Sequence, residues 1–250
     1  MKKTSWAFSL YLCVSLVFVS PLAAVELEQA AGGLNGKNKE EVVAAVAYIA
    51  KHADEVPPIV MFLASARAMA LGDIETSGFL FYAAQIRAKF DLQRFPPVGE
   101  GGNSPGVAIG AIKYQVGAVV NPRVFRAPEI YSKILDRLDT LDAKTGDTYD
   151  PGWEYKPSAQ YEEKGHTWEK ELLKTIKSDY LMSARGLSRL LNTPEYFTAF
   201  KIVQDFNFGS ADNREDTDNK STYDEAINTM TRIETEMKIK GMFYKGEDAS

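Results

Sequence analysis

The sequence is poor in the residues from which many catalytic and metal sites are built. It contains one cysteine, Cys13, and two histidines, His52 and His166. Cys13 lies in an N-terminal apolar run that we expect to be removed, which excludes cysteine nucleophiles, thiolate metal sites and disulfides from the mature chain. Two histidines are too few for a histidine-rich metal site, and any serine–histidine–acid triad would have to use one of them.

Long apolar runs are also lacking. The longest, from Trp6 to Val19, has 14 residues, whereas a membrane-spanning helix needs about 20. Lys2 and Lys3 precede it, and small residues follow at Ala23 and Ala24. This order predicts a secretory signal peptide over residues 1–24, cleaved near Ala24. We therefore expect residues 25–250 to form a single helical domain that is periplasmic and has no transmembrane segment.

Positive charge is scarce too. The chain has 29 lysines and arginines against 34 acidic residues, a net charge of −5, which becomes −7 without Lys2 and Lys3. No cluster of basic residues is present to release phosphate counterions, so nucleic acid is not an expected partner. A partner protein with a basic surface would be attracted instead.

Strand-like alternation of apolar and polar residues is missing, and apolar residues recur at helical spacing. The sequence predicts an all-α fold, a single-domain bundle of about eight helices around a central helical hairpin over residues 58–92. Pro58 suits the first turn of one helix, Gly72 its left-handed C-terminal position, and Asp73 the cap of the next. The inward side of that second helix is predicted from five residues, and Arg87 is expected to lie elsewhere. These five are Phe79, Tyr82, Ala83, Ile86 and Phe90.

Weaker signals place the other elements. Glycines predict a loop over residues 25–37, before a helix capped by Asn38. A glycine-rich helix from Pro105 is expected to end at Asn121–Pro122 and to pack closely against the hairpin. Further helices are predicted from Pro128, from the region of Ser158 or Thr167 to Leu191, from Pro194 to about Asn207, and from Thr222 to Gly241.

Three patterns resemble functional motifs but lack a part that the chemistry requires. Residues 102–106 match G-x-S-x-G, yet Pro105 follows the serine and has no N–H for an oxyanion hole, so a helix start is favoured. Asp136, Asp139 and Asp142 have no second acidic motif facing them and indicate a solvated helix face. The acidic stretch 212–218 lacks the glycine and glutamate of an EF-hand.

We therefore expect no catalytic residues, no metal and no cofactor, and we predict that the protein is not an enzyme. Two alternatives stay open: a cell-envelope hydrolase that uses paired carboxylates, and a helical scaffold that binds peptides.

Two irregular stretches are the best candidates for binding a partner. Tryptophan and tyrosine on a turn-rich segment, as at residues 149–155, are typical interface anchors. The acidic loop 209–221 would attract a basic partner. The predicted partner-binding residues are Trp153, Tyr155, Asp212, Glu215, Asp216 and Asp218.

The hairpin resembles a single tetratricopeptide or Sel1-like unit. The resemblance lies in its alternate alanines, the Leu71–Asp73 turn and residues 81–84, and it covers one unit, whereas true arrays repeat. The alanines are Ala64, Ala66, Ala68 and Ala70.

Residues 81–87, FYAAQIR, in an exported helical chain without mature cysteine are similar to periplasmic immunity proteins of type VI secretion effectors, in particular those that neutralise phospholipase D-type effectors. This resemblance implies a stoichiometric inhibitor without a catalytic centre, which occludes a toxic effector enzyme with a basic active-site region.

Overall fold

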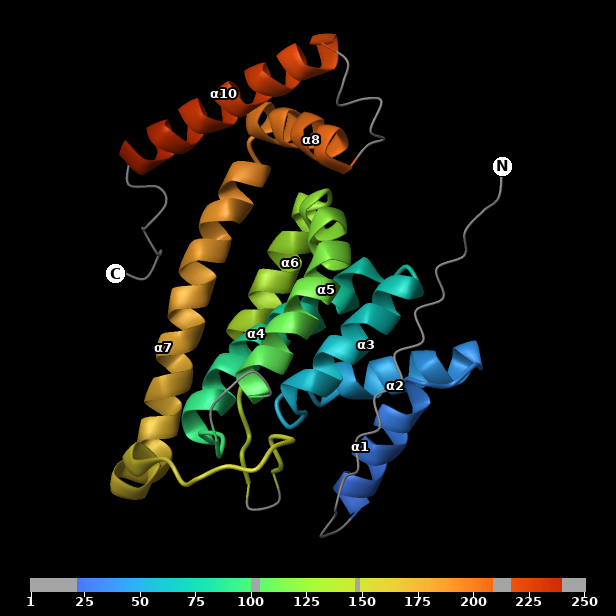
Figure 1. Cartoon of the computed structure of the whole chain (residues 1–250), viewed down its shortest axis with the longest axis vertical. Helices are drawn as coiled ribbons and strands as arrows, with labels where there is room; N and C mark the ends of the chain where they lie inside the picture. Colours follow the sequence, from blue (N-terminus) through green and yellow to red (C-terminus); the bar gives the residue numbers. More distant parts are fainter. Residues whose placement is uncertain (1–21, 100–103, 147–148, 209–216, 240–250) are drawn as a thin grey trace.

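The fold was obtained as a computed structural model that describes residues 22–99, 104–146, 149–208 and 217–239. The described residues form nine α-helices and no β-strand, which confirms the predicted all-α class (Figure 1). None of these helices is both long and apolar enough to cross a membrane. The helices are α1 Leu22–Gly33, α2 Lys39–Lys51, α3 Pro58–Ala70, α4 Ile74–Arg94, α5 Pro105–Phe125, α6 Pro128–Asp139, α7 Ala159–Leu191, α8 Pro194–Phe208 and α10 Thr217–Ile239.

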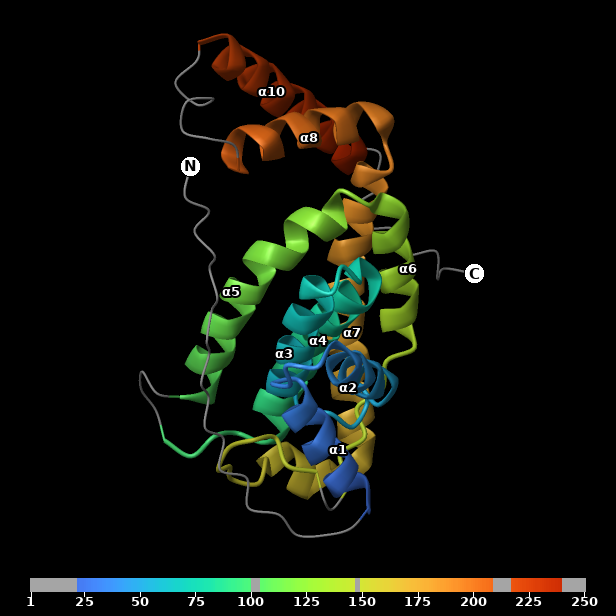
Figure 2. The same cartoon turned by 90° about the vertical axis from the view of Figure 1, so that its right-hand side faces the viewer.

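The predicted hairpin is formed by α3 and α4 and lies at the centre of the bundle. Gly72 adopts φ 85° between the two helices, and the Asp73 side chain accepts a hydrogen bond of 2.9 Å from the Thr76 amide. Ser65 and Ser77 bond each other's backbone carbonyls at 2.8 Å, joining the buried faces of the two helices. Because α4 packs against α3, α5, α6 and α7, it is buried along most of its length (Figure 2).

The N-terminal part corrects one prediction. Much of residues 25–37, expected to be a loop, belongs to α1. Ala30 and Leu34 are buried against the rest of the core. A Cβ on Gly33 would lie 3.1 Å from that of Ala45 on α2, so this glycine serves close helix packing. Burial on α2 has outweighed the low helix propensity of glycine.

The end of α5 corrects another prediction, because the helix continues through Pro122 to Phe125. Proline inside a helix costs about 3 kcal/mol through its missing N–H and its steric clash. Val120 and Val124, on either side, are fully buried, and the Tyr82 hydroxyl donates a 3.1 Å hydrogen bond to the Asn121 side chain. Tertiary packing therefore carries the helix past the proline.

The expected close approach of α5 to the hairpin is confirmed at one of its glycines. A Cβ on Gly117 would lie 2.9 Å from Cζ of Phe81, whereas one on Gly110 would meet nothing within 4 Å. A tighter contact lies on α4, where a Cβ on Gly78 would come within 2.5 Å of Cδ1 of Ile134. Glycine thus allows α4 to approach both α5 and α6.

The C-terminal helices extend the bundle at one end. Gly165, with φ 59°, breaks the regular geometry of α7 near its start, and α8 and α10 pack together near the other end of α7 (Figure 1).

α10 begins at Thr217, before the predicted Thr222. The Thr222 hydroxyl donates to the Asp218 carbonyl at 2.9 Å, so Thr222 lies inside the helix instead of capping it. The helix buries Ala226, Ile233 and Met237, and Met230 packs partly buried against the core.

Candidate functional site

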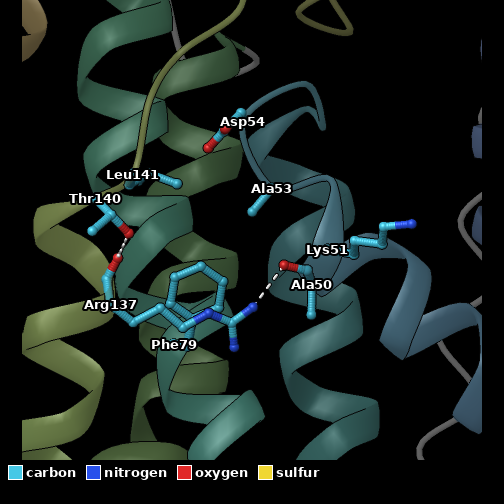
Figure 3. A pocket seen from close by; sticks show the side chains of 8 residues that line it. All are labelled: Ala50, Lys51, Ala53, Asp54, Phe79, Arg137, Thr140 and Leu141. Atoms are coloured by element: carbon cyan, nitrogen blue, oxygen red, sulfur yellow. Dashed lines mark hydrogen bonds between the residues drawn. The ribbon is translucent and has the colours of Figure 1, made fainter.

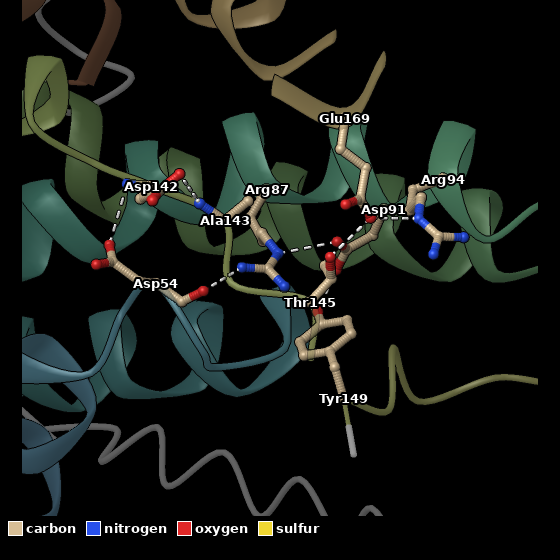
Figure 4. A network of polar contacts seen from close by, with 9 residues as sticks. All are labelled: Asp54, Arg87, Asp91, Arg94, Asp142, Ala143, Thr145, Tyr149 and Glu169. Carbon is tan, nitrogen blue, oxygen red and sulfur yellow. Dashed lines mark hydrogen bonds and ion pairs between the residues drawn. The ribbon is translucent and has the colours of Figure 1, made fainter. Parts of the chain in front are cut away.

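A buried ion pair lies at the C-terminal half of α4. Arg87 is only 1% exposed, and its Nε lies 2.8 Å from Oδ1 of Asp91, one turn further on. The Tyr149 hydroxyl donates to the other oxygen of Asp91, and Nη1 of Arg87 donates to the Asp54 carbonyl (Figure 4). The burial of Arg87, with its charge matched by Asp91, was not predicted from the sequence.

Burial dominates the electrostatics of this cluster. It raises the pKa of the Asp91 carboxyl, against the opposing effects of Arg87 and of the Tyr149 hydroxyl. Burial also raises the pKa of Tyr149 well above its ordinary value, with a further contribution from Asp91, so the phenol stays protonated and acts as a donor. The Arg87 guanidinium lies 4.3 Å from the centre of the Tyr149 ring. Nη2 of Arg87 is buried without a hydrogen-bond partner, and it is part of the guanidinium that stacks on the Tyr149 ring.

A second cluster is centred on Glu169, near the start of α7. Its carboxylate accepts hydrogen bonds from Nε of Arg94, from the Thr145 hydroxyl at 2.8 Å, and from Nδ1 of His166 at 2.6 Å. Burial raises the pKa of Glu169, but these hydrogen bonds outweigh it and leave the pKa below its ordinary value. The Arg94 guanidinium also stacks 3.1 Å from the centre of the Tyr161 ring. His166 thus joins a carboxylate, while its own ring remains 74% exposed.

Together the two clusters hold two irregular stretches, residues 141–146 and 149–157, against one end of the bundle; we call these two stretches the tethered segment. Thr145 and Tyr149 bind the two carboxylates. The Lys144 amide donates to the Asp54 carbonyl at 2.8 Å, and the Trp153 indole donates to the Phe95 carbonyl at 2.8 Å. The described residues of this segment have no regular helical structure, yet side-chain and backbone bonds fix them at short intervals.

The last part of the tethered segment also pairs with the strand-like residues that follow α4. The Val98 amide donates to the Glu154 carbonyl, and the Lys156 amide to the Pro96 carbonyl, each at 2.9 Å. This bridge places Tyr155 edge-on to the Phe95 ring, with ring centres 4.9 Å apart. Tyr155 and Val98 remain 41% and 42% exposed, so each of the two paired stretches presents an apolar side chain at the surface on a fixed backbone.

The six predicted partner-binding residues do not all belong to this surface. Tyr155 is exposed, whereas Trp153 is half-buried and mainly holds the segment in place. Asp218 is exposed in the first turn of α10, at the opposite end of α7 from the tethered segment (Figures 1 and 2). The remaining acidic residues lie outside the described part of the chain. They are Asp212, Glu215 and Asp216.

Two hollows between the described helices have the size of a small-ligand site. A cavity of about 200 Å³ lies between α2, α4 and α6 (Figure 3). Arg137 occupies its wall, donating to the Ala50 carbonyl at 2.8 Å and lying 3.5 Å from the centre of the Phe79 ring. Burial lowers the pKa of Arg137. Asp54 is the one carboxylate in this lining, so the cavity does not supply the pair that a carboxylate-based hydrolase needs.

The second hollow is an open groove of about 860 Å³ between α1 and α2. Its two carboxylates, Glu26 and Glu41, are both exposed, so neither lies in the apolar surroundings that produce a general acid. Among the described residues, no group of three or more histidine, cysteine or acidic side chains is arranged to hold a metal ion.

Comparison of the chain with protein-family models, with curated proteins and with solved structures finds no match. The site must therefore be interpreted from its own geometry.

Proposed function

We propose that the protein is an exported inhibitor that binds a partner protein and occludes it, as an immunity protein does for a toxic effector enzyme. The observation that carries this proposal is the tethered segment. An irregular stretch of chain is fixed by two buried arginine–carboxylate clusters, presents Tyr155 at the surface, and pairs with the stretch that carries the exposed Val98. Loops placed by a rigid scaffold are where proteins most often carry binding function.

The way in which the segment is fixed supports a positional role. Removing charges from water is costly, and apolar side chains of similar volume often stabilise a core as well as a buried ion pair does. The Arg87–Asp91 and Arg94–Glu169 pairs both lie under the same segment. The carboxylate of each pair accepts a hydrogen bond from that segment. A segment held in one conformation loses less entropy on binding, which favours affinity for a partner.

The exposed charges of the tethered segment agree with the expected partner. Asp142, Asp150 and Glu154 are exposed on the segment, together with Lys144 and Lys156. An acidic excess around an aromatic contact favours a basic partner surface, and it speeds encounter at low salt. The resemblance of residues 81–87 to immunity proteins implies the same kind of partner, an effector enzyme with a basic active-site region.

The test is binding of the purified chain to the purified product of the neighbouring reading frame, measured by calorimetry together with inhibition of that product's activity. We expect a stoichiometric complex and loss of activity. Tyr155→Ala and Val98→Ala should each weaken binding by about 1 kcal/mol or more. Val43, on α2, is 47% exposed and gives a matched control; Val43→Ala should bind as the wild type does. A wild-type protein that forms no complex would refute the proposal.

A further inference from the structure

A second surface, on α5, has the composition of an interface. Its outward positions include Val107, Tyr114 and Val119, which are 53%, 81% and 48% exposed. The exposed positions between them are mostly short and uncharged, with Lys113 and Gln115 as the exceptions, and they include Ala108, Gly110, Ala111 and Ala118. A helix at the surface of a soluble bundle normally carries charged residues on its outer side. α5 is apolar on its outer side as well as on its buried side.

The charge of this region is also opposite to that of the rest of the chain. No acidic residue occurs from Gly101 to Pro128, a stretch that contains the bases Lys113, Arg123 and Arg126. The remainder of the chain holds 26 basic residues, 29 minus these three, and all 34 acidic residues. Lys113 and Arg123 are exposed on α5 itself. The α5 surface is therefore apolar with a positive rim on a protein that is negative overall.

α5 is firmly seated, so its outer side is a fixed surface. Gly117 lets the helix approach the Phe81 ring, and the rings of Phe125 and Phe200 on α8 pack edge-on at 6.3 Å. At the C-terminal end, Arg126 donates to Gln204 at 2.8 Å and also binds Asp205 on α8. The apolar outer residues therefore stay at the surface while the helix is held from behind.

We propose that the outer side of α5 is a second contact surface for the same partner protein, and that it receives an apolar face of that partner rimmed by acidic side chains. This inference rests on the proposed function. Charge complementarity selects the occupant, because Lys113 and Arg123 would be paired by Asp or Glu at the edge of the contact. The partner would thus present a basic region to Tyr155 and an acidic-rimmed apolar face to α5.

Size argues against a second copy of this chain as the occupant. The mostly apolar outer side of α5 spans residues 107–119, about 20 Å of helix, and at a width of about 10 Å its footprint is roughly 200 Å². A stable complex buries about 800 Å² on each partner, so two α5 helices alone do not supply a dimer. A membrane surface is also a poor fit, since interfacial helices insert large side chains such as Trp, Phe and Leu, whereas α5 exposes valine, alanine and one tyrosine.

The experiment uses the full chain and the purified product of the neighbouring reading frame. Ala111→Glu places a charge in the middle of the α5 surface, and we expect Kd to rise at least about tenfold, as for a charge buried in an interface. Ala47→Glu, at an exposed position of α2, is the matched control and should leave Kd within about twofold. Lys113→Glu should lower the association rate at low salt, and the difference should shrink as salt is added.

The outcomes separate this inference from the proposed function. Failure of the wild-type protein to bind overturns both. Wild-type binding that Tyr155→Ala weakens and Ala111→Glu does not overturns the α5 surface alone. Two further measurements can also overturn it. One is co-sedimentation of the wild type, but not of Ala111→Glu, with phosphatidylethanolamine–phosphatidylglycerol vesicles. The other is a wild-type dimer in sedimentation velocity that Ala111→Glu converts to a monomer.

Discussion

Replacing Asp91 with asparagine tests how much the buried Arg87–Asp91 pair under the tethered segment contributes to the free energy of unfolding. Asparagine keeps the shape of the side chain and removes its charge, leaving Arg87 with 1% exposure and no counter-charge. Breaking a buried pair in this way costs about 3–5 kcal/mol, a large share of the ~5–15 kcal/mol that holds a domain folded. We therefore expect a large fall in the free energy of unfolding.

The assay is urea unfolding followed by circular dichroism, with the wild type, Asp91→Asn and a surface control measured under the same conditions. The control is Asp139→Asn. Asp139 pairs with Arg185 at 3.0 Å, but the two side chains are 54% and 40% exposed, and such pairs contribute about 0–1 kcal/mol. The same substitution at the two sites differs mainly in burial, so the comparison isolates the effect of desolvation.

A double variant then separates charge from packing. Arg87→Met with Asp91→Leu removes both charges together and keeps apolar volume, so we expect it to unfold less readily than Asp91→Asn alone. A loss of stability in Asp91→Asn no larger than that in Asp139→Asn, or a double variant less stable than all the others, would contradict a cost of desolvation at Asp91.

Three further predictions concern other parts of the fold. Gly117→Ala should lower the free energy of unfolding by about 1–3 kcal/mol, because its Cβ would lie 2.9 Å from Phe81. Gly110→Ala, in open space, should raise it by up to about 1 kcal/mol. Urea unfolding measures both changes. The pKa of Glu169 is lower in the folded protein than its unfolded-state pKa of about 4.3. The ionised carboxylate therefore stabilises the fold above that pH, and this stabilisation is lost as pH falls through the folded-state pKa. Glu169→Gln should therefore flatten the acid limb of a stability–pH curve. Trp153→Phe removes one indole hydrogen bond, costing about 1 kcal/mol, and should speed hydrogen exchange in the tethered segment while that in α3 and α4 is unchanged.

Local signals were sufficient to predict the hairpin and several caps. Gly72 adopts a left-handed conformation and Asp73 caps α4, as their residue types favour. Both roles depend only on neighbouring backbone, so they can be predicted locally. The Asn38 side chain likewise accepts from the amide of Glu40 at 2.9 Å. α1 was missed and the end of α5 was misplaced because distant packing decided both. Nothing near Pro122 in the sequence indicates that Val120 and Val124 will be fully buried.

The candidate site was only partly predictable. Trp153 and Tyr155 were identified from residue type and context, but which of them is exposed depends on the Phe95 carbonyl and ring, far away in sequence. The Arg87–Asp91 pair could have been found, because a base and an acid four residues apart share one helical face. The Arg94–Glu169 pair joins residues 75 positions apart and leaves no local signal.

The placement of these charges on α4 connects the fold to the proposed function. Arg87, Asp91 and Arg94 follow one another at spacings of four and three, so they lie along one side of the helix. That side faces the tethered segment, while Phe81 and Tyr82 face the core. One helix therefore both fills the centre of the bundle and fixes the loop that presents Tyr155. A change at Asp91 should then weaken partner binding even at low urea, where the bundle is still folded, although Asp91 itself is inaccessible to any partner.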